Sequence, residues 1–232
     1  SIDGKVKIDP YGLSSTPIDK AGQVPRSKVV DRSFTWDDTQ WMQKRAKLGS
    51  KQPMTMYEMH PASWQTEDGK YLNYREIAQK LVEHCKTTGC THVELMGILE
   101  HPNEGSQGYH VTNYFSPNSR MGSVEDFKFM VDYLHKNDIG VVLDWVPNHF
   151  ALDDYALTKF DGTNQFEPSK IAALFSLRGL FMLKWGANPF NLRKKSTRNF
   201  LISSAAYWLK EMHIDGLRVD AIRPLLNSDR KS

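Results

Sequence analysis

The ten residues that decide the fold read His213-Ile214-Asp215-Gly216-Leu217-Arg218-Val219-Asp220-Ala221-Ile222. Apolar residues alternate with Arg218 and Asp220 here, and strict alternation over a few residues is typical of a β-strand. On such a strand Arg218 and Asp220 share one face, where the guanidinium is close enough to keep the carboxylate ionised and fixed in place. A carboxylate held in this way can act as a nucleophile or a base. The alternative is a structural ion pair at a strand end, and these two residues alone do not decide between the two.

Composition is that of an ordinary globular protein. Of the 232 residues, 40% are hydrophobic and 25% are charged, which allows a sizeable core. The net charge of +3 is small and the Lys and Arg residues are scattered, so we expect no nucleic-acid partner.

Cysteine usage and the apolar runs bear on location. The two cysteines, Cys85 and Cys90, are too few for a disulfide framework, which favours a reducing compartment. The N-terminal residues contain no apolar signal core, and the most apolar run, residues 171–183, contains Arg178 and is too short to cross a bilayer. We therefore expect a cytoplasmic protein with no membrane partner.

Hydrophobic periodicity predicts strands that alternate with helices. We expect strands over 54–59, 91–96, 140–146 and 217–221, and helices over 73–88, from a capping box at Ser123, and from a cap at Thr197. This order calls for a parallel sheet with helical crossovers, either a doubly wound sheet or a (β/α)8 barrel. No glycine-rich phosphate loop follows a strand, which weakens the case for a doubly wound sheet that binds nucleotides. Residues 1–50 show no sustained period and are interpreted as a linker.

Polar and aromatic residues follow the predicted strands, where a barrel places its active site. Arg218 and Asp220 end the last strand, and the loop after the second strand carries Tyr109 among several His, Glu and Gly residues. Asp144 lies inside an otherwise apolar strand, where an unpaired carboxylate is costly and therefore needs a partner or a function. His149 follows Asp144 after a proline turn, and a single histidine of this kind is more often structural than functional. Together these residues favour a functional site.

Two motifs in these loops resemble a known family. Residues 144–149 (Asp-Trp-Val-Pro-Asn-His) and 215–220 (Asp-Gly-Leu-Arg-Val-Asp) resemble the first two sequence blocks of the α-amylase superfamily of glycoside hydrolases and transferases. The segments around residues 57–64, 100–115, 160–163, 185–191 and 198–201 narrow the resemblance to the 1,4-α-glucan branching enzymes. The similarity extends from about residue 5 to residue 226.

This resemblance implies a fold and its boundaries. We expect an α/β protein in which residues 51–232 form the first half of a (β/α)8 TIM barrel, with about its first four strands. Residues 1–50 would be the linker and the end of an N-terminal β-sandwich that the chain does not include.

The resemblance also implies a reaction. Asp220 would be the nucleophile that forms a covalent glycosyl-enzyme intermediate, with Arg218 keeping it ionised. Tyr109 would stack on the sugar at the cleavage site, while Asp144 and His149 would hydrogen-bond its hydroxyl groups. A branching enzyme cleaves an α-1,4 link of a glycogen-type or starch-type glucan and passes the chain to a 6-hydroxyl, and it needs no cofactor and no metal.

Four departures from the family pattern qualify this prediction. Gln107 lies where these enzymes commonly have tryptophan, and Asn148 is closer to the amylase pattern. Residues 168–184 are more apolar than expected and could form an extra helix or an insert. The family's acid/base glutamate has no match in the chain, so we expect a fragment with little catalysis alone, or one whose barrel another polypeptide completes. The alternatives are an amylase-type or debranching-type α-glucan hydrolase and a non-catalytic glucan-binding subunit.

Overall fold

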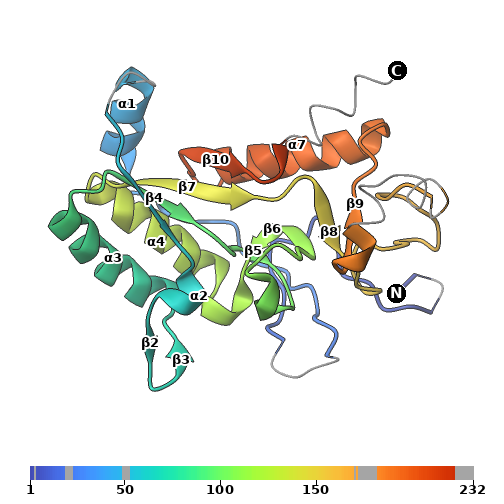
Figure 1. Ribbon diagram of the computed structural model, residues 1–232. Coiled ribbons are helices and arrows are strands. Elements are labelled where there is room, and N and C mark those ends of the chain that lie inside the picture. The colour runs from blue at the N-terminus through green and yellow to red at the C-terminus, as the bar shows by residue number, and fades with distance from the viewer. Residues whose placement is uncertain (3, 19–22, 49–52, 170, 172–181, 223–232) are drawn as a thin grey trace.

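The computed structural model describes residues 1–2, 4–18, 23–48, 53–169, 171 and 182–222. Its centre is a parallel sheet of four strands in the order β1 (Met56–Met59), β4 (His92–Leu95), β7 (Gly140–Trp145) and β10 (Gly216–Val219) (Figure 1). Each strand therefore pairs with the next one of this sheet along the chain, as in successive strands of a barrel. The predicted α/β fold with part of a TIM barrel is confirmed.

Helical crossovers join these strands. Helix α3 (Tyr74–Thr88) connects β1 to β4, α4 (Val124–Lys136) connects β4 to β7, and α7 (Lys195–Lys210) precedes β10. Helices α3 and α4 lie side by side along one face of the sheet (Figure 1). Their apolar faces bury Ile77, Leu81, Phe127 and Met130 in one core with the strand residues that point to the same side.

Local signals explain where two of the helices begin and end. Asn73 and Glu76 form a capping box at α3. Ser123 and Asp126 form the predicted capping box at α4. Gly89 ends α3 with a φ of 74°, a left-handed conformation that glycine adopts without strain. The predicted cap at Thr197 is wrong. Helix α7 begins at Lys195, and Thr197 is a buried residue of its first turn.

Short elements fill the connections at the carboxyl ends of the strands. Three antiparallel pairs are formed in the described part of the chain (Figure 1). They are β2 (Thr66–Glu67) with β3 (Lys70–Tyr71), β5 (Leu99–Glu100) with β6 (Asn113–Pro117), and β8 (His149–Ala151) with β9 (Ala187–Pro189). Helix α2 (Pro61–Trp64) and the 3-10 turns η2 (Glu104–Ser106) and η3 (Ser119–Met121) complete these loops.

Three features differ from the expectations or lie beyond them. Helix α1 (Thr39–Leu48) occupies part of the segment interpreted as a linker, and it was not predicted. Cys85 and Cys90 form a disulfide, which the sequence reasoning also did not predict. Most of the apolar segment 168–184 lies outside the described residues.

None of the helices in the described part of the chain has the length and apolar composition that crossing a bilayer requires.

Candidate active site

Arg218 joins two carboxylates at the carboxyl end of the sheet. Arg218 on β10 is the register partner of Asp144 on β7, so both side chains project to the same face. Its Nη1 donates to Asp144 Oδ1 at 2.8 Å and to Asp220 Oδ1 at 3.0 Å. Asp220 lies just past the end of β10, where its backbone N–H donates to the Trp145 carbonyl at 2.9 Å. The predicted pairing of Arg218 with Asp220 is therefore present, with Asp144 as a third member.

Tyr109 meets the same cluster from the loop between β5 and β6. Its hydroxyl donates to Asp144 Oδ2 at 2.8 Å, so the two oxygens of Asp144 are bound by Tyr109 and Arg218. Burial raises the pKa of the Asp144 carboxyl, and the two hydrogen bonds oppose that effect without cancelling it. Burial and the contact with Asp144 also raise the pKa of Tyr109, which keeps its hydroxyl protonated as a donor.

Two glycines bring Tyr109 into position. Gly108 has a φ of +91°, and a Cβ built on it would lie 2.2 Å from Cα of Gly97 in the turn after β4. The backbone that carries Tyr109 is therefore pressed directly against that turn, which leaves no room for any side chain at position 108. This close approach fixes the height of the tyrosine over the ends of the strands.

The preceding turn η2 is anchored by Glu104. This carboxylate accepts a hydrogen bond from the Tyr71 hydroxyl of β3, and Arg120 Nε lies 2.9 Å from its other oxygen. Arg120 also donates to Nε2 of His101 at 3.1 Å, and burial lowers the pKa of His101 to about 4, so this imidazole is neutral and accepts the bond. The loop that leads to Tyr109 is thus held at both ends.

His149 supports the tyrosine from behind. It begins β8 and is 1% exposed, and its Nε2 donates to the Tyr109 carbonyl at 2.9 Å. Asn148 beside it is fully buried, and its carbonyl accepts the Phe190 N–H at 3.1 Å. The structure therefore brings all five predicted site residues together, while the contact of His149 with a sugar stays a prediction.

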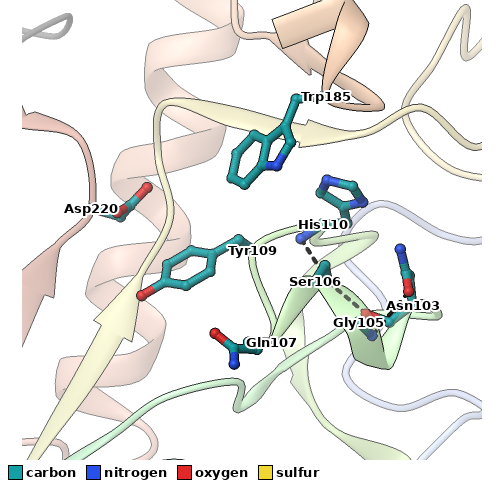
Figure 2. Close-up of a pocket in the computed structure, with 8 residues that line it drawn as sticks. All are labelled: Asn103, Gly105, Ser106, Gln107, Tyr109, His110, Trp185 and Asp220. Carbon is teal, nitrogen blue, oxygen red and sulfur yellow. Dashed lines mark hydrogen bonds between the residues drawn. The ribbon is translucent and has the colours of Figure 1, made fainter.

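Asp220 lines a cavity of about 480 Å³, and this volume is within the usual range for small-molecule sites. Trp185 and Tyr109 lie on different sides of this pocket, and Asp220 stands at its edge (Figure 2). The remaining lining residues are Asn103, Gly105, Ser106, Gln107 and His110. The sequence reasoning gave no role to Trp185 or His110, although Trp185-Gly186 was among the segments that carry the family resemblance.

Metal binding has no structural support in the part of the chain that is described. Within those ranges, His, Cys, Asp and Glu side chains form no group of three or more that could hold a metal ion. The expectation that the reaction needs neither metal nor cofactor stays a prediction.

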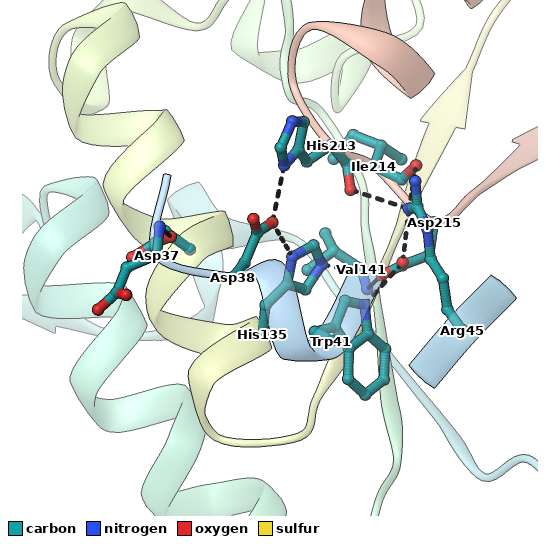
Figure 3. A network of polar contacts seen from close by, with 10 residues as sticks. Asp37, Asp38, Trp41, Arg45, His135, Val141, His213, Ile214 and Asp215 are labelled. Atoms are coloured by element: carbon teal, nitrogen blue, oxygen red, sulfur yellow. Dashed lines mark hydrogen bonds and ion pairs between the residues drawn. The ribbon is translucent and has the colours of Figure 1, made fainter. Parts of the chain in front are cut away.

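A second polar network anchors the opposite end of β10 (Figure 3). Asp215, the residue before this strand, accepts hydrogen bonds from His135 Nε2 at 3.0 Å, Arg45 Nη1 at 2.8 Å and Trp41 Nε1 at 2.9 Å. It also accepts the Val141 N–H of β7 at 2.7 Å. Helix α1 is thereby tied to the start of the strand that carries Arg218, at the end of the sheet remote from the pocket.

Comparisons with known proteins agree with this geometry. The family described as alpha amylase, catalytic domain, matches residues 58–170. The 1,4-alpha-glucan branching enzyme GlgB of Hydrogenovibrio crunogenus is 47% identical over 226 residues, which are 97% of this chain and 30% of that protein. The enzyme of the same name from Rhodococcus jostii is 46% identical over 98% of this chain and 30% of its own length. The chain thus spans about 30% of the curated relatives it matches.

Solved structures show the same fold. A crystal structure from Salmonella typhimurium, assigned to the alpha amylases, has a TM-score of 0.73 and 28% identity, over 97% of this chain and 34% of that one. An α-amylase from Geobacillus thermoleovorans has a TM-score of 0.60 over 82% of this chain and 42% of that one, and at 23% identity it supports the fold alone. In sequence, in its parallel sheet and in the Arg218 cluster, this chain is thus similar to proteins of the α-amylase superfamily.

Proposed function

We propose that the protein carrying this chain is a 1,4-α-glucan branching enzyme in which Asp220 is the nucleophile. The observation that carries the proposal is the placement of Asp220 at the edge of the pocket, with Arg218 holding its carboxylate 3.0 Å away. The similarity to proteins named as branching enzymes over nearly the whole chain supports the choice of reaction.

The chemistry follows from two carboxyl groups. Asp220 attacks the anomeric carbon while the bond to the glycosidic oxygen breaks, and a carboxylic acid about 5 Å away protonates that oxygen. A 6-hydroxyl of a glucan then gives its proton to the carboxylate left by that acid, displaces Asp220 from the anomeric carbon and forms the α-1,6 link. Asp144 does not fit the role of the acid, because Arg218 and Tyr109 bind its two oxygens. We propose that the acid comes from the part of the relatives' length that this chain does not span.

The substrate contacts follow the same geometry. Tyr109 presents its ring beside Asp220 and stacks on the sugar at the cleavage site, because aromatic faces pack well on the apolar face of a sugar ring. Asp144 and His149 contact Tyr109 and support this position. Their hydrogen bonds to the hydroxyl groups of that sugar stay a prediction, because neither residue lines the pocket. The proposed substrate is therefore an α-1,4-glucan such as amylose or glycogen.

A polypeptide that completes the barrel is part of the proposal. Among the described strands, β1 and β10 are the outer strands of the four-stranded sheet. Glu58 on β1 and Glu94 on β4 are register partners and lie on the same face of the sheet. This is the face of Arg218, whose Nε lies 4.0 Å from Glu94 Oε1. Burial raises the pKa of Glu94, and the neighbouring Glu58 raises it further, so this face favours a cationic or hydrogen-bonding partner. A cytoplasmic location and the lack of nucleic-acid and membrane partners stay predictions.

The test is conversion of amylose by the protein as its source gene encodes it. We expect α-1,6 branch points to form while iodine staining falls, and Asp220→Asn to abolish both changes. Loss of staining with release of reducing sugar, and without branch points, would favour the hydrolase instead. Asn148, which suggested that alternative, is fully buried and does not line the pocket.

The chain of 232 residues is assayed in parallel with the protein that the source gene encodes. We expect little turnover from this chain alone, because the acid that protonates the leaving oxygen is not among the groups placed around Asp220. Binding of glycogen by the Asp220→Asn chain, without turnover by its parent, would point to the glucan-binding subunit.

A further inference from the structure

We propose that Trp185 is a second sugar-binding surface of the pocket, which stacks on a glucose unit of the α-1,4-glucan next to the unit at Tyr109. The inference rests on the proposed function and extends it, because it names a residue that determines how the glucan chain is held. It stands on the placement of Trp185, on the contacts that hold its ring, and on the polar groups around it.

Trp185 is exposed just before a buried strand. Its side chain is 44% exposed, whereas the residues of β9 that follow it are buried. Exposed tryptophan on a flat surface needs no explanation, but this one lines the cavity that contains Asp220. A large aromatic face left open inside a concave site is typical of ligand binding.

The indole is held in place before any ligand arrives. The His110 ring packs against it edge-on at a centroid distance of 5.3 Å, and the His149 ring lies 5.2 Å away at a tilt of 58°. The backbone N–H of Trp185 donates to the Met182 carbonyl at 3.0 Å. A ring fixed in this way loses little conformational entropy when it binds a ligand.

The chemistry of the pocket matches a sugar rather than an apolar ligand. Trp185 and Tyr109 offer aromatic surfaces on different sides, and the side chains of Gln107 and Asn103 line the same pocket (Figure 2). A glucose unit has a face of C–H groups and a rim of hydroxyl groups, so it needs aromatic surfaces with amide and hydroxyl groups at the side. Because Asp220 stands at the edge of the same cavity, the ligand at Trp185 is continuous with the glucan that Asp220 attacks.

The experiment measures maltoheptaose binding and branching kinetics in the protein as its source gene encodes it. We expect Trp185→Ala to raise the KM for amylose and the Kd for maltoheptaose about tenfold, with kcat changed much less. Trp185→Phe keeps an aromatic face and should recover most of the affinity. Ile202→Ala is the matched control, because Ile202 is 64% exposed on α7 and does not line the pocket.

Two readouts separate this inference from the proposed function. The Kd is measured in the Asp220→Asn background, where no turnover occurs, so it reports on Trp185 even if the reaction is not branching. Unchanged Kd and KM in Trp185→Ala, with an unchanged Tm, would overturn the inference while branching could still hold. No maltoheptaose binding by the Asp220→Asn parent would also overturn it. A large loss in Trp185→Phe, equal to that in Trp185→Ala, would point to packing against the histidines instead of sugar stacking.

Discussion

His135 and Asp215 form a buried ion pair, with Nε2 and Oδ2 3.0 Å apart, at the start of the strand that carries Arg218 (Figure 3). The other nitrogen of His135 lies 2.9 Å from Asp38, which His213 also contacts at 2.7 Å. Burial alone would lower the pKa of His135, but the two carboxylates outweigh it and raise this pKa above 6.5. The protonated imidazole therefore joins helix α1, through the residue before it, to β10.

Stability should depend on this proton. Because the folded-state pKa of His135 is raised, its contribution is fully present below pH 6.5 and is lost as the pH rises through the folded pKa. We expect the Tm of the native protein to fall as the pH rises above 6.5, relative to that of His135→Gln, which cannot gain or lose this proton. Thermal unfolding of both proteins from pH 5 to 9 measures the difference.

Other titratable groups near His135 also make the Tm depend on pH, so the native protein has to be compared with His135→Gln. The contact with His135 lowers the pKa of Asp215 to about 2 against the effect of burial, so this group weakens the fold only in strong acid. Burial lowers the pKa of His92, whose contribution is lost as the pH falls below 6.5. Arg45 and His213 complete the charged surroundings. A Tm difference that does not change with pH would show that His135 carries no linked proton.

Gly108 provides a sharp steric test. The Cβ of an alanine at position 108 would lie 2.2 Å from Cα of Gly97, and its φ would stay positive. The turn that contains Gly97 would therefore have to move. We expect Gly108→Ala to lower the free energy of unfolding by about 3 kcal/mol and to displace Tyr109, with loss of activity. Gly69→Ala is the control, because Gly69 has a φ of +72° with open space around it and should cost only about 1 kcal/mol. Denaturant unfolding measures both, and equal losses would contradict the steric argument.

Local patterns were enough to predict the sheet. Alternation around Arg218 and the capping box at Ser123 depend on neighbouring residues, and the structure places that strand and that helix within one or two residues of the prediction. The end of the last strand was predicted too far along. Asp220 bonds Trp145, and Ala221 then turns away from the strand with a φ of 49°, which alternation does not reveal.

Contacts distant in sequence account for what was missed. Helix α1 has no clear apolar period, and it is held by Trp41, whose partner Asp215 is 174 residues away. Trp185 joins the pocket because β9 pairs with β8, which places it beside His110 from a loop far upstream. The pairing of Arg218 with Asp220 was predicted from the alternation, whereas the sugar-binding role of Asp144 came from a family resemblance. The contact between Arg218 and Asp144 depends on a strand pairing that the periodicity could not assign.

Arg218 should be needed for stability as well as for the reaction. Asp144 is 3% exposed, and without the guanidinium its only remaining partner here is the Tyr109 hydroxyl. We expect Arg218→Ala to cost about 2 kcal/mol near pH 8, less than for a fully buried pair because the Arg218 side chain is 41% exposed. Burial already raises the pKa of Asp144, so the variant should recover stability as the pH falls and the carboxyl takes up a proton. Arg218→Ala with Asp144→Asn should remove most of this pH dependence, because an amide has no charge to bury. Unfolding free energies at pH 5 and pH 8 for the single and double variants measure the effect, and equal values at both pH for Arg218→Ala would mean that Asp144 does not need its cation.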